Sequence, residues 1–194
     1  MSTAQKTHKI AVTAMLAAVS TILMALDFSI PFLIPSFVKM DFSELPALLA
    51  TFSLGPLSGV AVCLIKNLIN LTMTTTSGVG ELCNFLLGVC FVVPAGLIYQ
   101  HSKSRKGALI GSLVGAAVMA VLSVPINYFI SYPFYTVFMP LDVIIGMYQE
   151  LIPSVNGLLA CLVIFNMPFT LLKGLLDMAL AFLIYKPLSP LLHK

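Results

Sequence analysis

Six apolar segments fill most of this 194-residue chain and limit what it can fold into. Several are close to the roughly 20 residues that a helix needs to cross a bilayer. Only 9% of the residues are charged, whereas soluble domains carry about 25%. The pattern predicts an all-α integral membrane protein with a single domain, 1–194. We expect six transmembrane helices, over residues 10–27, 44–54, 57–72, 79–99, 107–130 and 167–186.

The apolar stretch Leu45–Leu71 decides the topology, because Gly55-Pro56 interrupts it. One helix of this length would measure about 40 Å, more than the roughly 30 Å of the hydrocarbon core. Gly55-Pro56 could kink one helix or form a turn between two. Only a turn brings seven basic residues to one side, as the positive-inside rule requires: Lys6, Lys9, Lys103, Arg105, Lys106, Lys186 and Lys194. Both termini are then cytoplasmic, and 131–165 is a partly embedded outer loop.

Several function classes lack their sequence signals. The net charge of +3 comes without a basic stripe, which argues against a nucleic-acid partner. No G-x-x-x-x-G-K-[ST], H-E-x-x-H or G-x-S-x-G motif is present, so we expect no enzyme and no ATPase of its own. The cysteines form no C-x-x-C pair, and we interpret them as small buried hydrophobes without a metal: Cys63, Cys83, Cys90 and Cys161.

Polar residues within the spans gather toward the predicted outer face. They include Glu81 and Asn84 at the start of 79–99, Asn127 near the end of 107–130, and Lys173 in the last span. A charge in the bilayer costs at least about 2.5–3.5 kcal/mol, so it needs a partner or a cavity. Lys173 either donates to a bound polar ligand or pairs with Asp177, one helical turn later. We predict an outward-facing polar pocket above an apolar base.

Other polar residues have structural readings. For Lys66, inside 57–72, we favour a structural ion pair. Asp41 and Glu44 suit the N-terminus of the second span, with Ser43 as its N-cap.

Two residues keep two interpretations each. Glu81 either contacts a ligand or only suits the helix N-terminus, where a carboxylate is favoured. Asn127 could hydrogen-bond between helices rather than bind a ligand. Ala14 and Ala18 form a small-xxx-small face on the first span, which is typical of close helix contact in lipid.

The segment Phe37–Leu68 resembles the riboflavin-specific S component of energy-coupling factor (ECF) transporters. It contains K-x-D-F-S, a following L-P, a G-P-L-x-G turn and I-K-N. Further matches are GVGELCNFLLG, VVPAGLIY, the K-x-R-K-G-A loop, N-Y-F, P-F-x-L-L-K-G and Y-K-P-L-S-P. The resemblance covers nearly the whole chain.

This resemblance implies a six-helix subunit of the cell membrane that binds riboflavin at its outer side. Riboflavin is then the transported ligand and not a cofactor. The partners implied are a transmembrane coupling subunit and two cytoplasmic ATPase subunits. Carried onto this chain, the resemblance implies substrate contacts from Asn127, Lys173, Glu81, Asn84 and the Lys39–Phe42 loop, here Lys39, Asp41 and Phe42. It also implies coupling-subunit docking at Ala14 and Ala18.

One position departs from the family pattern. The related motif commonly reads P-F-N-x-x-K-G, and Thr170 stands here at the asparagine. Threonine keeps a donor and an acceptor but lacks the amide geometry, and Asn166, one turn earlier, is a candidate to compensate. One alternative ligand is flavin mononucleotide, because Lys173 would also tolerate a phosphate. Another vitamin is the second alternative.

Overall fold

Helices cover the long apolar segments in the computed structural model, which describes the backbone of residues 2–192 and the side chains of residues 2–185. A helix satisfies its backbone N–H and C=O groups internally, as lipid surroundings require. The main helices are α1 (Thr3–Ala25), α2 (Glu44–Leu54), α3 (Pro56–Asn70), α4 (Val79–His101), α5 (Arg105–Ile126) and α9 (Met167–Leu192).

Five helical stretches within the described residues are long and apolar enough to cross a membrane. They are Thr3–Ala25, Pro56–Met73, Val79–His101, Arg105–Tyr135 and Leu158–Tyr185. The predicted all-α membrane fold class is therefore confirmed.

Helix α2 is apolar but has only 11 residues, about 16 Å at 1.5 Å per residue. Its residues from Glu44 to Thr51 are all buried. Neighbouring helices therefore surround α2, which is how a helix shorter than the bilayer can lie within it.

The Gly55-Pro56 pair forms a turn between α2 and α3, as predicted. Gly55 has a φ of 100°, a region that glycine enters without steric cost. Pro56 is the first residue of α3, where its missing N–H breaks no helical hydrogen bond.

Two long helices are extended by wider turns. Helix α5 continues through the π-helix η2 (Asn127–Ser131) into α6 (Tyr132–Tyr135), just after Pro125 removes a backbone donor. Helix α9 is preceded by α8 (Leu158–Cys161) and the π-helix η3 (Leu162–Asn166). The expected outer loop over 131–165 is thus wrong at both ends, because helix occupies them.

Short elements complete the chain. Helix α7 (Leu141–Gln149) lies between α6 and α8, and the 3-10 turn η1 (Leu71–Met73) follows α3. Strands β1 (Phe28–Ser29) and β2 (Lys39–Met40) form a small antiparallel hairpin, with Phe28 opposite Met40.

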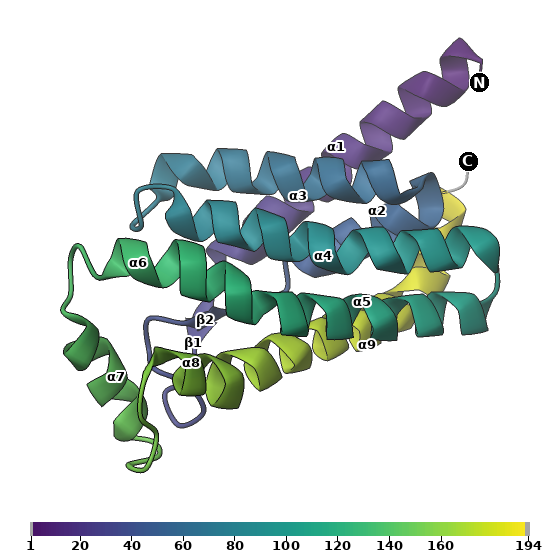
Figure 1. The fold of residues 1–194 in the computed structure, drawn as a ribbon. Helices are drawn as coiled ribbons and strands as arrows, with labels where there is room; N and C mark the ends of the chain where they lie inside the picture. The colour runs from purple at the N-terminus through teal and green to yellow at the C-terminus, as the bar shows by residue number, and fades with distance from the viewer. Residues whose placement is uncertain (1, 193–194) are drawn as a thin grey trace.

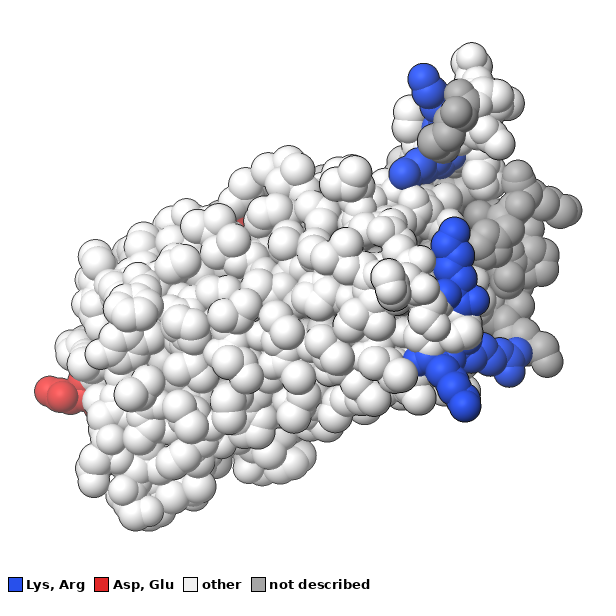
Figure 2. Space-filling model, turned by 45° about the vertical axis from the view of Figure 1, so that its right-hand side comes forward, with Lys and Arg blue, Asp and Glu red and all other residues white. Residues whose placement is uncertain are grey.

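The helices run side by side and give the bundle two different ends (Figure 1). The N-terminus, the α4–α5 connection and the C-terminal part of α9 lie at one end, while the β1–β2 hairpin, α6 and α7 lie at the other. Figure 2 shows Lys and Arg gathered at the first end, beside a flank on which almost no charged residue is visible. We call this first end the basic end, after Lys6, Lys9, Lys103, Arg105 and Lys106, and the other the hairpin end. The side chain of Lys186 and all of Lys194 lie outside the described residues.

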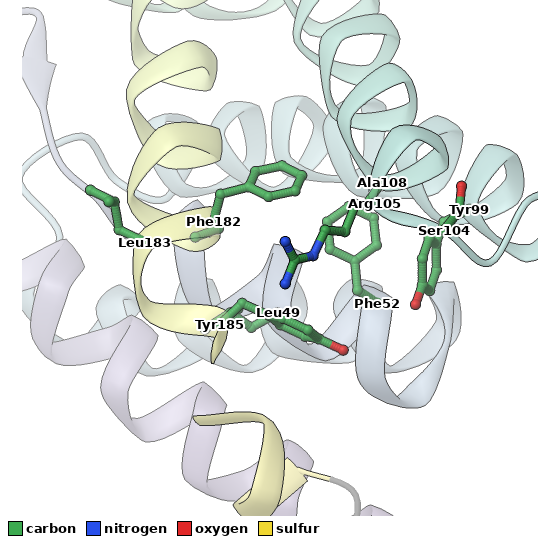
Figure 3. Close-up of a pocket in the computed structure, with 10 residues that line it drawn as sticks. Leu49, Phe52, Tyr99, Ser104, Arg105, Ala108, Phe182, Leu183 and Tyr185 are labelled. Carbon is green, nitrogen blue, oxygen red and sulfur yellow. The ribbon is translucent and has the colours of Figure 1, made fainter. Parts of the chain in front are cut away.

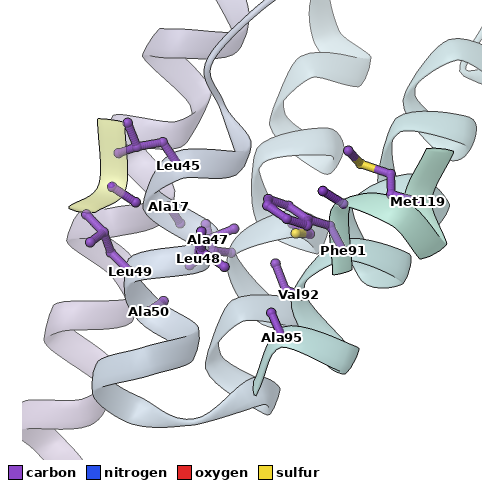
Figure 4. Close-up of a cluster of buried hydrophobic side chains, with 14 residues drawn as sticks. Ala17, Leu45, Ala47, Leu48, Leu49, Ala50, Phe91, Val92, Ala95 and Met119 are labelled. Atoms are coloured by element: carbon purple, nitrogen blue, oxygen red, sulfur yellow. The ribbon is translucent and has the colours of Figure 1, made fainter. Parts of the chain in front are cut away.

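Small side chains let the helices of the core approach closely. The buried cluster in Figure 4 combines alanines with larger residues such as Phe91 and Met119. A Cβ on Gly111 would lie 2.6 Å from the carbonyl oxygen of Ala95, and one on Gly115 would lie 2.4 Å from that of Phe91. Helices α4 and α5 therefore pack backbone to backbone, in the manner of small-residue helix contacts in membranes.

Candidate functional site

A buried ion pair fastens α3 to the start of α2. Lys66 Nζ donates to Glu44 Oε1 at 2.6 Å and to Ser43 Oγ at 2.6 Å, and the two charged side chains are 0% and 2% exposed. The structural pairing favoured for Lys66 is confirmed. Ser43 is the N-cap residue of α2, as predicted, but its side chain makes no cap hydrogen bond and instead accepts from Lys66 Nζ.

A second ion pair joins α9 to the segment before α2. Lys173 Nζ donates to Asp41 Oδ2 at 2.8 Å, with side-chain exposures of 12% and 8%. The alternative pairing of Lys173 with Asp177 is wrong, because both Asp177 carboxylate oxygens are buried without a hydrogen-bond partner. Burial would raise the pKa of Asp41, but the charges of Lys173 and Lys66 lower it to about 2.

Beside this second ion pair lies a cavity of about 180 Å³ at the hairpin end. We call it the hairpin-end cavity. Its walls come from the β1–β2 loop, β2, α2, α4, α5, η2, α6, η3 and α9. The lining residues are Phe37, Val38, Lys39, Glu44, Gly80, Cys83, Asn84, Leu87, Met119, Asn127, Ser131, Tyr132, Tyr135, Asn166, Phe169, Thr170 and Lys173.

Six of the nine predicted substrate contacts line this cavity: Lys39, Asn84, Asn127, Asn166, Thr170 and Lys173. They come from positions far apart in the chain, and the fold brings them to one place. The other three lie nearby but are not among the lining residues: Asp41, Phe42 and Glu81.

Two of the lining polar groups keep free hydrogen-bonding capacity. The Asn127 Nδ2 donates to the Ser123 carbonyl oxygen at 2.8 Å, one turn back in its own helix. Its Oδ1 and the Thr170 hydroxyl have no hydrogen-bond partner among the described residues. They are thus available to a ligand, and the alternative considered for Asn127, a hydrogen bond between helices, is absent from the described contacts.

Asn166 is already engaged in a buried network with two tyrosines. The Tyr148 hydroxyl donates to Asn166 Oδ1 at 2.7 Å, and Asn166 Nδ2 donates to the Tyr132 hydroxyl at 3.3 Å. The two tyrosine hydroxyls also contact each other. Burial, first of all, raises the pKa of Tyr148, so its hydroxyl stays neutral. Asn166 therefore links η3 to α6 and α7 and has little capacity left to replace the family asparagine at Thr170.

The remaining predicted residues have local roles. Glu81 accepts hydrogen bonds from Asn70 at 3.1 Å, Thr74 at 2.9 Å and Thr76 at 3.1 Å, which ties down the α3–α4 connection. Phe42 packs against Phe28 with ring centroids 6.1 Å apart.

Lys39 reaches the cavity wall while its Nζ donates to Asp27 at 3.0 Å across the base of the β1–β2 loop. This surface ion pair closes the loop that leads to Phe37.

An aromatic wall was not predicted residue by residue. Phe37, from the β1–β2 loop, meets the rings of Tyr132, Tyr135 and Tyr148 edge-on at centroid distances of 6.1–6.4 Å. Phe169 completes the wall from α9. Tyr132 and Tyr135 follow Pro125 and are three residues apart, a spacing that places two residues on one side of a helix. This spacing is the sequence signal that could have placed both rings in one wall.

A second, larger cavity of about 570 Å³ lies at the basic end (Figure 3). We call it the basic-end cavity. Aromatic and aliphatic side chains from α2, α4, α5 and α9 line it, together with one cation: Leu49, Phe52, Tyr99, Ser104, Arg105, Ala108, Ala181, Phe182, Leu183 and Tyr185. None of the predicted substrate contacts is among them.

Ala14 and Ala18, the predicted docking residues, are both exposed on α1. The opposite side of this helix, with Val12, Ala17 and Ser20, is buried. The exposed side leaves room for a partner helix.

Comparison with known proteins places the chain in a family. Residues 8–185 match the family described as ECF transporter, substrate-specific component. This chain is a substrate-specific component of the ECF transporters. The family is one of transport subunits, and the chain is accordingly a multi-pass protein of the cell membrane.

Individual relatives agree along almost their whole length. The chain is 33% identical to the riboflavin transporter RibU of Staphylococcus aureus (strain TCH60), over 98% of this chain and 95% of the relative. It is 32% identical to the riboflavin transporter FmnP of Bacillus subtilis (strain 168), covering 95% and 94%. A solved structure of the S component of a bacterial ECF transporter matches with a TM-score of 0.76 and 30% identity, covering 97% and 99%. The S-component fold is therefore shared.

Proposed function

We propose that this S component binds riboflavin in the hairpin-end cavity and delivers it for uptake. The observation that carries the proposal is the convergence of Asn84, Asn127, Thr170 and Lys173 with an aromatic wall in one cavity. The naming of close relatives as riboflavin transporters supports the choice of ligand.

The chemistry of the cavity suits a flat ring with a polyhydroxylated tail. Phe37, Tyr132, Tyr135 and Phe169 offer aromatic faces and edges to the isoalloxazine ring. The free amide oxygen of Asn127, the Thr170 hydroxyl and the ammonium of Lys173 offer acceptors and donors to the tail. Few polar groups in a mostly apolar pocket are typical of small-molecule sites.

Ligand entry requires the segment 27–43 to move. The cavity of about 180 Å³ is below the roughly 300–1,000 Å³ typical of ligand pockets. Two hydrogen bonds lie within that segment, Lys39 to Asp27 and Ser29 to Ser36, and the ion pair of Asp41 with Lys173 ties it to α9. We infer that Lys173 exchanges part of its contact with Asp41 for the ligand when the segment rises.

We also propose the topology and the assembly. The helices α1, α2, α3, α4, α5 and α9 are the six spans, and the basic end faces the cytoplasm by the positive-inside rule. The chain lacks a Walker A motif, so ATP hydrolysis belongs to two separate ATPase subunits, reached through a transmembrane coupling subunit. The exposed Ala14 and Ala18 side of α1 is the proposed docking face for that coupling subunit.

The experiment is a fluorescence titration of purified protein with riboflavin. Binding should quench riboflavin fluorescence at nanomolar concentrations, and excess thiamine should not compete. Flavin mononucleotide should compete only if Lys173 accepts its phosphate. Absence of quenching at micromolar protein would refute the riboflavin proposal, and competition by thiamine would favour another vitamin.

A further inference from the structure

The basic-end cavity has the composition of a lipid-binding site. Its volume of about 570 Å³ lies within the range typical of ligand pockets. The lining is aromatic and aliphatic apart from the Ser104 and tyrosine hydroxyls and one guanidinium. Figure 3 shows Arg105 directed into the space between Phe182, Phe52 and Tyr185.

No carboxylate of the described residues accompanies this guanidinium. None of the seven acidic residues lines the cavity, and Arg105 has no ion-pair partner among the described residues. The chain contains no acidic residue at all between Glu81 and Asp142, which includes the whole α4–α5 connection. Arg105 and the two neighbouring cations, Lys103 and Lys106, are all exposed. An anionic occupant of the cavity would supply the counter-charge that Arg105 lacks among the described residues.

The cavity also reaches the flank of the bundle. Leu183 lines it and is 72% exposed, on an α9 stretch that is apolar enough to face lipid. The tyrosine rings of Tyr99 and Tyr185 belong to the residue type that is enriched at membrane–water interfaces. The cavity thus combines an apolar groove that faces lipid with a cation, Arg105, at the interfacial end.

We propose that the basic-end cavity binds one anionic phospholipid. The phosphate contacts Arg105, and an acyl chain lies along the groove between α2 and α9. Basic pockets between helices on the cytoplasmic side bind acidic lipid head groups in this way. The proposal does not depend on the ligand of the hairpin-end cavity.

The test is native mass spectrometry of the full chain in detergent with added phosphatidylglycerol or phosphatidylcholine. One phosphatidylglycerol should be retained per protein, about five-fold more tightly than phosphatidylcholine, as one favourable charge contact predicts. Arg105→Gln should remove the preference. Lys103→Gln, in the same connection but outside the cavity lining, is the matched control and should keep it. Because Arg105 is exposed, we expect its substitution to leave folding intact. The thermal midpoint, measured without lipid, checks that both variants fold.

Other results would overturn the proposal. Equal retention of the two lipids would show that the cavity has no preference for an anion, and equal loss of the preference in both variants would reduce the effect to surface charge. Displacement by glycerol 3-phosphate would indicate a phosphate site without an acyl groove. If Arg105→Gln left lipid retention unchanged but weakened assembly with the coupling subunit, the groove would belong to a protein partner instead.

Discussion

Substitution of Lys173 separates a ligand contact from a purely structural ion pair. Lys173→Met removes the ammonium that lies 2.8 Å from Asp41 Oδ2 and leaves that carboxylate, only 8% exposed, without its main counter-charge. Breaking a buried pair on one side costs about 3–5 kcal/mol, and we expect about 3 kcal/mol because both groups keep some exposure. Loss of a charged hydrogen bond to riboflavin should cost a further 1.5–3 kcal/mol of binding, roughly 10- to 150-fold in Kd.

The double variant distinguishes the two effects. Asp41→Asn combined with Lys173→Met removes both charges and should recover much of the stability, measured as the thermal midpoint in detergent. Affinity, measured by riboflavin fluorescence quenching, should stay low in the double variant, because the ligand contact is still missing. Asp41→Asn alone should keep wild-type affinity or bind more tightly, since it releases Lys173 and the segment 27–43. Wild-type affinity in Lys173→Met, or its return in the double variant, would refute the ligand role.

Three further predictions follow from the same contacts. Lys66→Met should lower the free energy of unfolding by about 3–5 kcal/mol, because it leaves Glu44 buried and unpaired; an unchanged thermal midpoint would contradict this. The lowered pKa of Asp41 contributes stability that is complete above pH 3.8, its ordinary pKa, and is lost as the pH falls toward about 2. Wild type should therefore lose about 2 kcal/mol more than Asp41→Asn over that interval, in acid-unfolding curves. Leucine at both Ala14 and Ala18 should spare riboflavin binding but abolish uptake by cells, and normal uptake would remove the docking role.

The arrangement of the helices was predictable because its signals are local. Gly55-Pro56 marks a kink or a turn by its backbone chemistry, and the placement of Lys103, Arg105 and Lys106 selects the turn over the kink. The π-helical turns were not predictable in the same way. Pro125 signals a break in a helix, but whether the chain stops or continues through a wider turn depends on the packing around it.

The partner of Lys173 shows where sequence reasoning fails. Asp177 is one turn away on the same helix and is visible as a pair, whereas Asp41 is 132 residues away. Only the fold brings Asp41 to α9, where Asp41, and not Asp177, forms the ion pair with Lys173. Asp177 is left buried, and its carboxylate oxygens have no hydrogen-bond partner among the described residues.

The polar and aromatic halves of the site differ in the same respect. An asparagine such as Asn127 within an apolar helix is conspicuous, because it needs a reason to be there. Phe37 or Tyr132 is not conspicuous in a chain that is 59% hydrophobic, since rings facing lipid and rings facing a cavity look alike. Asn166 illustrates the reverse error, because its amide serves two tyrosines that the sequence does not link to it.

The central claim is that riboflavin binds in the hairpin-end cavity and not in the larger cavity at the basic end. Two tryptophan substitutions on the same helix test it in one fluorescence titration. Thr170→Trp fills the smaller cavity and should weaken riboflavin binding by more than about 100-fold, because the indole and the ligand cannot share that space. Leu183→Trp, at the exposed mouth of the larger cavity, should leave the affinity unchanged. Loss of binding in Leu183→Trp with normal binding in Thr170→Trp would contradict the account.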